Sequence, residues 1–203
     1  MSMTGVETPA LDDDRIAPST GAEIAVINAA RECRDRLGRE KVTMDDVCAA
    51  AGISRATLYR LFPGGRDVLF DAVRVQSLNE FFDSLRSDIE GADSLEEFLV
   101  RVIVGASTAL RDDEHLAVAL ATEPGAALGD LTFEGLERII RSATEFFTPL
   151  AARFTSAHNS AEIFDIMTRL VISYHLSASR VFDFTERDSA RRFVRNHLLP
   201  TIH

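Results

Sequence analysis

A short cluster of side chains in the first third of the chain has the chemistry to bind nucleic acid. Arg55 and Arg60 carry guanidinium groups, which can donate two parallel hydrogen bonds to guanine or pair with a phosphate. Ala56 and Thr57 can contact the methyl group of thymine, and the hydroxyl of Tyr59 can donate to a phosphate oxygen. On one helix, these residues would form a polar face suited to the major groove of a duplex.

The flanking residues predict the helices that position this cluster. Thr43 is a typical helix N-cap, and Asp46, three residues on, can complete a capping box. Gly52 stands where a chain leaving a helix often needs a positive φ, and Ser54 is a second N-cap. The stretch therefore predicts a helix-turn-helix, although a helical hairpin with a solvated polar face would share part of this pattern.

The expected contacts follow from how such a unit docks. The N-terminal half of the second helix enters the major groove, while residues around it hold the backbone. We expect bases to be read by Arg55, Ala56 and Thr57. We expect phosphates to be bound by Thr43, Tyr59, Arg60 and Arg66.

The segment GISRATLYRLFPGGRDVLF resembles the DNA-binding segment of the TetR family of bacterial one-component transcriptional regulators. The shared features are the turn glycine Gly52, the run LYRLF at residues 58–62, and a cation, Arg66, at the start of the next helix. The family usually has Lys in place of Arg66, and residues 63–65 vary its short loop. The resemblance implies a homodimer on a palindromic operator. It also implies a ligand pocket between the middle helices, and a two-fold four-helix bundle formed by the last two helices of each copy.

The net charge of −10 is unevenly distributed along the 203 residues. Residues 15–75 hold 10 Lys or Arg and 8 Asp or Glu, a net charge of +2, whereas residues 1–14 carry −4 and residues 76–203 carry −8. An acidic body discourages nonspecific adhesion, while a local cationic face can still meet phosphates. The acidic composition therefore does not exclude DNA binding.

Three parts are predicted: a disordered tail over residues 1–17, a helix-turn-helix domain over 18–75, and a helical ligand-binding and dimerisation domain over 76–203. Apolar residues recur at helical spacing and no alternation of period two persists, so we expect an all-α fold with about nine helices. No apolar run reaches membrane-spanning length, and we expect a cytoplasmic protein. Cys33 and Cys48 fall on expected core faces, which favours buried thiols.

A long helix from Arg66 toward Ser87 is expected to run from the first domain into the second, where a shift at one end would move the other. Pro124, Gly125 and Gly129 are expected to break the chain. The remaining expected helices cover residues 95–110, 112–120, 132–147, 159–182 and 185–200.

Eleven of the 13 Phe residues lie at or after Phe81, which predicts either a core or a pocket for a large, mostly apolar effector. For Arg101, Tyr174 and His175, structural roles compete with ligand binding. The candidate ligand contacts are Phe98, Arg101, Val102, Phe133, Leu136, Ile140, Phe147, Tyr174 and His175. The last two helices have more apolar surface than one domain readily hides, and the candidate dimer contacts are Met167, Val171, Ala178, Phe193, Val194 and His197.

The sequence contains no residue pattern that favours an enzymatic function. Asp112, Asp113, Glu114 and His115 resemble a metal-ligand cluster, but neighbouring residues point different ways around a helix, and no second His or Cys stands at ligand spacing. There is no phosphate loop, dinucleotide-binding glycine pattern or nucleophile elbow. We therefore expect no enzyme, no cofactor and no metal.

The function favoured by these patterns is a ligand-responsive repressor. It would bind a palindromic operator as a homodimer and be released by a largely apolar small molecule. The alternative is a helical small-molecule carrier or enzyme with a non-functional helix-turn-helix. The sequence does not separate repression from activation.

Overall fold

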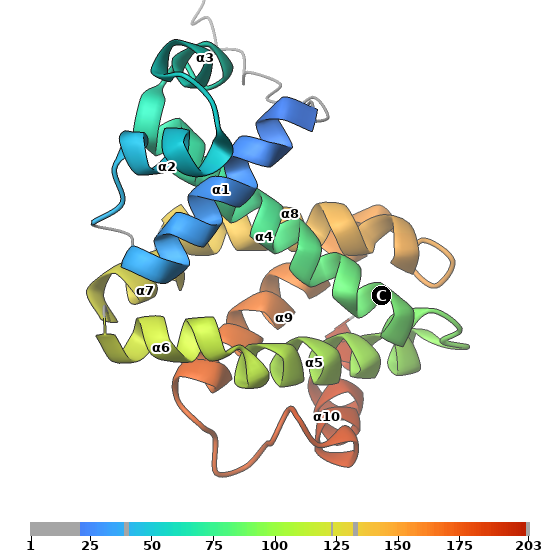
Figure 1. Cartoon of the computed structure of the whole chain (residues 1–203). Helices are drawn as coiled ribbons and strands as arrows, with labels where there is room; N and C mark the ends of the chain where they lie inside the picture. Colours follow the sequence, from blue (N-terminus) through green and yellow to red (C-terminus); the bar gives the residue numbers. More distant parts are fainter. Residues whose placement is uncertain (1–20, 39–40, 123, 132–133, 202–203) are drawn as a thin grey trace, which may run out of the picture. The chain divides into compact units, whose positions relative to one another are not determined.

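The computed structural model describes residues 21–38, 41–122, 124–131 and 134–201 (Figure 1). Within these ranges the chain forms ten α-helices, one π-helix and one 3-10 turn, and no strand. The predicted all-α fold is confirmed, with one helix more than the expected nine. The tail predicted over residues 1–17 lies outside the described residues.

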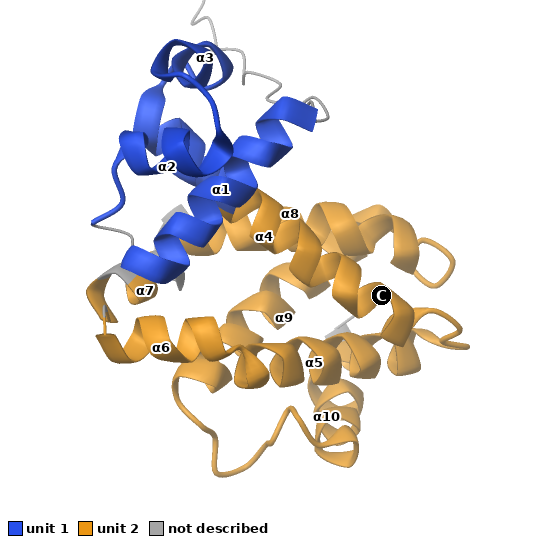
Figure 2. Cartoon of the chain, viewed as in Figure 1, with its two compact units in different colours: residues 1–73 blue, residues 74–203 orange. Residues whose placement is uncertain are grey.

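The chain divides into two compact units, Met1–Val73 and Arg74–His203 (Figure 2). We call them unit 1 and unit 2. The boundary falls inside α4 (Gly65–Ile89), a continuous helix of 25 residues. One continuous helix thus supplies residues to both units.

Unit 1 is built on α1, α2, α3 and the first turns of α4. Val26, Val47, Leu58 and Leu69, one from each helix, are at most 1% exposed and meet in its core. Ile24, near the start of the chain's first helix, is 42% exposed. The bounds of the first three helices are α1 (Gly21–Leu37), α2 (Met44–Ala51) and α3 (Arg55–Leu61).

The two cysteines belong to the core of unit 1. Both are free thiols and buried. The thiol of Cys33 donates to the carbonyl oxygen of Asp46 at 3.6 Å, which joins α1 to α2. A packing role for buried Cys, as predicted, accounts for both positions.

Unit 2 packs α8 on α9, and α5 on both α9 and α10. Its core contains a chain of phenyl rings, in which Phe98 lies 5.9 Å from Phe154 and 6.3 Å from Phe164, between ring centroids. The elements are α5 (Leu95–Asp112), α6 (Glu114–Thr122), α7 (Pro124–Leu131), α8 (Glu134–Ala151), α9 (Ala157–Leu176), α10 (Arg187–Phe193), the π-helix Val194–Leu198 and the 3-10 turn Leu199–Thr201.

The predicted break at Pro124 separates α6, which ends at Thr122, from α7, which begins at Pro124. The first position of a helix has no hydrogen-bond acceptor for its N–H, so proline is well suited to it. Gly125 and Gly129 are then carried inside the helix at a modest cost in propensity.

The ends of the last two predicted helices also differ. Ser156 caps α9 by accepting the N–H of Asn159 at 3.2 Å, three residues before the start of the expected range 159–182. The helix stops at Leu176, and the hydroxyl of Ser179 accepts the N–H of Phe182 at 3.2 Å in the loop that follows. The next helix begins at Arg187, after a turn closed by Asp183 and Thr185, whose hydroxyl donates to the Asp183 carboxylate at 2.7 Å.

A carboxylate at the start of α5 joins three arginines. Glu97 accepts from Arg101 at 2.7 Å and from Arg191 at 3.1 Å, and it also pairs with Arg187. The hydrogen bond from Arg101 is the main reason why the pKa of Glu97 lies below its ordinary value, and Arg191 and Arg187 lower it further. This network holds α10 on α5.

We expect Glu97→Gln to lower the free energy of unfolding by about 1–2 kcal/mol at pH 7, because it removes charge-assisted hydrogen bonds. The folded-state pKa of Glu97 is lowered, so its contribution is present above the unfolded pKa and is lost as the pH falls through the folded one. The difference between wild type and variant should therefore shrink in acid. Urea unfolding at pH 7 and at progressively lower pH measures it.

The control is Glu162→Gln, which removes a carboxylate that is 64% exposed and contacts His158 at 3.4 Å. Its effect should be small at every pH, since exposed ion pairs contribute little. An equal Glu97→Gln effect across the pH range would contradict the electrostatic account.

Candidate nucleic-acid interface and interior cavity

The first helix of the helix-turn-helix begins with a complete capping box. The hydroxyl of Thr43 accepts the backbone N–H of Asp46 at 3.2 Å, and the Asp46 carboxylate accepts the Thr43 N–H at 2.9 Å. The Thr43 hydroxyl also donates to this carboxylate at 2.6 Å. These bonds lower the pKa of Asp46. Thr43 is thus bound to its own helix, as the capping prediction requires.

The turn is formed at Gly52, whose φ is +65°. Its N–H donates to the carbonyl of Cys48, and the N–H of Ile53 donates to the same oxygen at 3.1 Å. A Cβ at Gly52 would meet no heavy atom within 4 Å. Backbone conformation, rather than space, therefore makes glycine favourable here.

Gly52→Ala is expected to lower the free energy of unfolding by about 1 kcal/mol, the cost of holding an L-residue in the left-handed region. Gly21→Ala is the matched control, because a Cβ at Gly21 also meets nothing within 4 Å and its φ is not positive. That variant should be neutral or slightly stabilising. Denaturant unfolding compares the two, and an equal effect would contradict this explanation.

The second helix, α3, presents the predicted base-reading residues on its open side. The hydroxyl of Ser54 accepts the N–H of Thr57 at 3.2 Å and lies 3.0 Å from the Thr57 hydroxyl. Leu58 is fully buried and fixes the inner face, whereas Arg55 and Ala56 are exposed. Packing and capping therefore leave the N-terminal half of α3 accessible.

Arg55 is also held by a carboxylate from the first helix. Its Nη2 donates to Asp45 Oδ2 at 2.6 Å, and its Nε pairs with Asp45 Oδ1. This interaction raises the pKa of the Arg55 guanidinium. Asp45 was missed from the sequence, because the two residues stand ten apart on different helices and no periodicity relates them.

The residues expected to bind phosphates follow in α3 and the start of α4. Tyr59 is 47% exposed and Arg60 is exposed. Gly65 has a φ of +68°, and a Cβ there would lie 3.3 Å from Tyr59 Cε1, so glycine lets the tyrosine ring lie close to the loop. The Arg66 guanidinium stands over the Phe70 ring, 5.0 Å from its centroid. Their phosphate contacts remain predictions.

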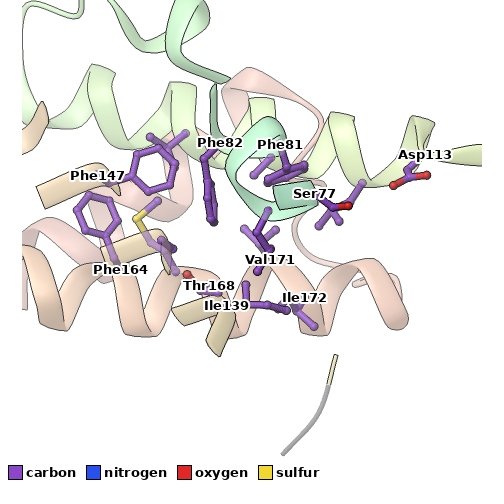
Figure 3. A pocket seen from close by; sticks show the side chains of 16 residues that line it. Ser77, Phe81, Phe82, Asp113, Ile139, Phe147, Phe164, Thr168, Val171 and Ile172 are labelled. Atoms are coloured by element: carbon purple, nitrogen blue, oxygen red, sulfur yellow. The ribbon is translucent and has the colours of Figure 1, made fainter. Parts of the chain in front are cut away.

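Unit 2 contains a cavity of about 210 Å³ (Figure 3). Side chains from α4, α5, α8 and α9 line it, and in this view Phe147 and Phe164 stand at one end and Asp113 at the other. Thirteen of its 16 lining residues are apolar, and the polar ones are Ser77, Asp113 and Thr168. No Lys or Arg is among these described lining residues. Such a cavity suits a largely apolar, uncharged molecule.

The family profile described as "Bacterial regulatory proteins, tetR family" matches residues 26–73, which contain the helix-turn-helix. Uncharacterized HTH-type transcriptional regulators of Mycobacterium tuberculosis and Mycobacterium bovis are 29% and 27% identical, over 68% of this chain and 67% of each relative. The chain thus resembles TetR-family transcriptional regulators, most directly over residues 26–73.

Solved structures show that this fold is shared with known TetR-family proteins. The TetR family repressor AlkX from Dietzia sp. has a TM-score of 0.66 at 24% identity, with 93% of this chain and 99% of that chain covered. A putative TetR-family transcriptional regulator from Mesorhizobium loti has a TM-score of 0.52 at 19% identity, with coverages of 88% and 98%. The likeness extends through unit 2, beyond the matched profile.

The structure brings only part of the predicted ligand-binding set to the cavity. Val102 and Phe147 line it. Phe98 is 1% exposed among other rings and does not line it. Leu136 and Ile140 are also absent from the lining, and their neighbour Ile139 is present instead. Phe133 lies outside the described residues.

The three polar ligand candidates have structural partners. Arg101 pairs with Glu97 and donates to the carbonyl of Glu90 at 2.9 Å, which ties α5 to the end of α4. The Tyr174 ring packs on Phe184 at 4.5 Å between centroids. Burial lowers the pKa of His175, and the nearby Asp113 carboxylate partly offsets this. None of the three lines this cavity, so their ligand contacts stay predictions.

Most of the predicted dimer contacts are interior. Met167, Val171, Phe193 and Val194 are 3%, 7%, 6% and 0% exposed. Most of their apolar surface is thus already covered within one chain. Met167 and Val171 line the cavity instead. Ala178 and His197 are exposed, and Ala178 lies beyond the end of α9.

The cluster at residues 112–115 has a structural role. Asp113 Oδ1 accepts the N–H of Leu116 at 2.9 Å at the start of α6. Over the described part of the chain, no three His, Cys, Asp or Glu side chains gather in a way that could hold a metal ion. Of the helices that the structure describes, none is both long and apolar enough to cross a bilayer.

Proposed function

We propose that this TetR-family regulator is a ligand-responsive repressor that binds a palindromic operator as a homodimer and is released by a largely apolar small molecule. The observation that carries the proposal is the open face of α3, where Arg55, Tyr59 and Arg60 are exposed, Thr57 is half-buried and Leu58 on the inner side is buried. This arrangement supports entry of α3 into the major groove. Arg55, Ala56 and Thr57 would read bases, and Thr43, Tyr59, Arg60 and Arg66 would hold phosphates.

The effector would occupy the cavity of unit 2. Its lining of phenyl and aliphatic side chains favours an apolar ligand, because transfer of such a ligand out of water lowers the free energy. The described lining contains no cation that could pair with a buried anion, which disfavours an anionic ligand. AlkX, which shares this fold, is a repressor implicated in biodegradation of n-alkanes. That association agrees with an apolar effector for this chain.

Coupling between effector and DNA would run along α4. Leu78, Phe81 and Phe82 of this helix line the cavity, and Leu69 and Phe70 of the same helix are buried in the core of unit 1. A ligand that favours one position of α4 would change the population of the DNA-binding conformer, by its differential affinity for the two states. Repression is lost when the favoured state spaces the two α3 helices wrongly.

A homodimer would use apolar surface that the single chain leaves open. In and after α9, Ile166 is 43%, Leu176 is 37% and Val181 is 67% exposed. These side chains replace the buried residues of the sequence-based set as our candidates for the contact. Two copies would place their α3 helices about 34–36 Å apart, one turn of the duplex. As a DNA-binding regulator, the protein would act in the cytoplasm.

Two experiments test the proposal. The first selects duplexes from a random pool at physiological salt. The second measures binding of a labelled selected duplex by fluorescence anisotropy, with 1-dodecanol added as the probe of the effector site. We expect an inverted repeat to be enriched, and 1-dodecanol to raise the Kd for it. Tight binding of 1-dodecanol without any selected duplex would favour the helical carrier instead. A selected repeat whose binding does not respond to 1-dodecanol or other uncharged apolar probes would reject effector control.

A further inference from the structure

Asp45 and Arg55 connect the two helices of the helix-turn-helix on its open side. Asp45 is the second residue of α2, and Arg55 is the first residue of α3. Both carboxylate oxygens are engaged, by Nε and Nη2 of the guanidinium. The side chains of Arg55 and Asp45 are 64% and 65% exposed, so the pair is accessible to solvent and to a duplex that docks on α3.

The pairing uses one edge of the guanidinium and leaves another free. Arginine has five N–H groups in a planar fork, and the Asp45 contacts occupy the Nε–H and one N–H of Nη2. The end formed by Nη1 and the other N–H of Nη2 can still donate two parallel hydrogen bonds to O6 and N7 of guanine. A carboxylate on the side edge and a guanine on the end are therefore compatible.

A second polar group of the same face is held in a similar way. The Thr57 hydroxyl lies 3.0 Å from the Ser54 hydroxyl, which also caps α3. Both groups expected to meet bases thus have fixed partners within the protein. Fixing them beforehand lowers the conformational entropy that must be lost on binding.

We propose that Asp45 is a specificity-determining positioning residue, which aims the Arg55 guanidinium at a guanine. This inference rests on the proposed DNA-reading function of α3. Asp45 would also act by repulsion. If Arg55 left Asp45 and bound a phosphate instead of a base, the Asp45 carboxylate would stand unpaired close to the DNA backbone. Its repulsion by the phosphates would weaken binding to duplexes that lack the guanine. Asp45 touches no base in this account and acts through Arg55.

The test compares Asp45→Asn with wild type on two duplexes. One is the selected duplex. In the other, an A·T pair replaces one G·C pair, at the position where the Arg55→Ala protein no longer prefers guanine. Wild type should prefer the first by about 10- to 100-fold. Asp45→Asn should reduce this ratio about ten-fold, while its affinity for the substituted duplex stays the same or rises, because one negative charge near the phosphates is gone.

Asp35→Asn is the matched control. It removes the same charge from unit 1 and breaks an ion pair with Arg34 at 2.8 Å, but it leaves Arg55 untouched. It should keep the wild-type ratio. Thermal unfolding of the Asp45→Asn protein should match wild type closely, since exposed pairs add little stability.

The double variant Asp45→Asn with Arg55→Ala completes the cycle. If Asp45 acts through Arg55, the double variant has the same base preference as Arg55→Ala alone. The inference is overturned if Asp45→Asn keeps the wild-type ratio, or if it weakens both duplexes equally. Failure of wild type to select any duplex would overturn the DNA-reading function as well, whereas a selected duplex with an unchanged Asp45→Asn ratio removes only the role of Asp45.

Discussion

Arg55→Ala is expected to lower the preference of the protein for its selected duplex by about 100-fold or more. One bidentate contact between arginine and guanine discriminates by roughly ten- to 100-fold, and a two-fold symmetric complex makes the contact twice. The fold should persist, because the Arg55 side chain is exposed and its ion pair is with the exposed Asp45. Competition anisotropy against a scrambled duplex measures the ratio.

Tyr59→Phe provides the comparison for this variant. It removes a hydroxyl that we expect on a phosphate, and the Tyr59 ring is 47% exposed beside Gly65. Binding should weaken similarly on all sequences, with the preference retained. If both variants changed affinity and preference alike, the division of α3 into base-reading and phosphate-binding residues would be wrong.

Ala106→Phe is expected to abolish the response to 1-dodecanol while leaving DNA binding intact. Ala106 is 9% exposed on α5 and lines the cavity of about 210 Å³. A phenyl group in this place would take much of the space that the chain of the probe needs. Because the effector acts through its differential affinity for two states, loss of its site removes the shift altogether. Anisotropy of the selected duplex, titrated with 1-dodecanol, measures the response.

Ala161→Phe is the control for adding a phenyl group. Ala161 is exposed in the first turns of α9 and does not line the cavity. This variant should respond to 1-dodecanol like wild type. An unchanged response of Ala106→Phe, with the variant correctly folded, would place the effector elsewhere. Loss of DNA binding by Ala106→Phe would instead indicate that filling the cavity itself favours the released state.

The helix-turn-helix could be predicted from the sequence almost residue by residue, because its determinants are local. Thr43 and Asp46 form the capping box within four residues, and Gly52 needs only its own backbone conformation. Ser54 caps α3 by bonding to Thr57, three residues on. Each signal joins a residue type to a position in one turn of the chain, so no tertiary knowledge is required.

For the interior of unit 2, the sequence predicts which residues face inward but not whether each one belongs to the core, the cavity or a dimer contact. Apolar spacing identifies the inward side of a helix, but core, cavity and dimer contact all need the same residue types. Phe98, expected at the ligand, is packed among rings, whereas Met167, expected at the dimer contact, lines the cavity. Three-dimensional packing of α4, α5, α8 and α9 decides between these roles.

The ion pairs between residues far apart in the chain could likewise not be predicted from the sequence. Arg101 was a ligand candidate because it interrupts an apolar helix, yet it pairs with Glu97, which also binds Arg191 from α10. Asp45 and Arg55 lie on different helices. A charged residue has many possible partners along a chain, and only the fold selects one.

Native mass spectrometry of the protein with its selected duplex tests the central claim most directly. The account predicts a complex of two chains with one duplex, or of a multiple of two chains. Addition of 1-dodecanol should convert it to free duplex and probe-bound protein. A complex with a single chain per duplex, or one that retains its DNA while it binds the probe, would contradict the account.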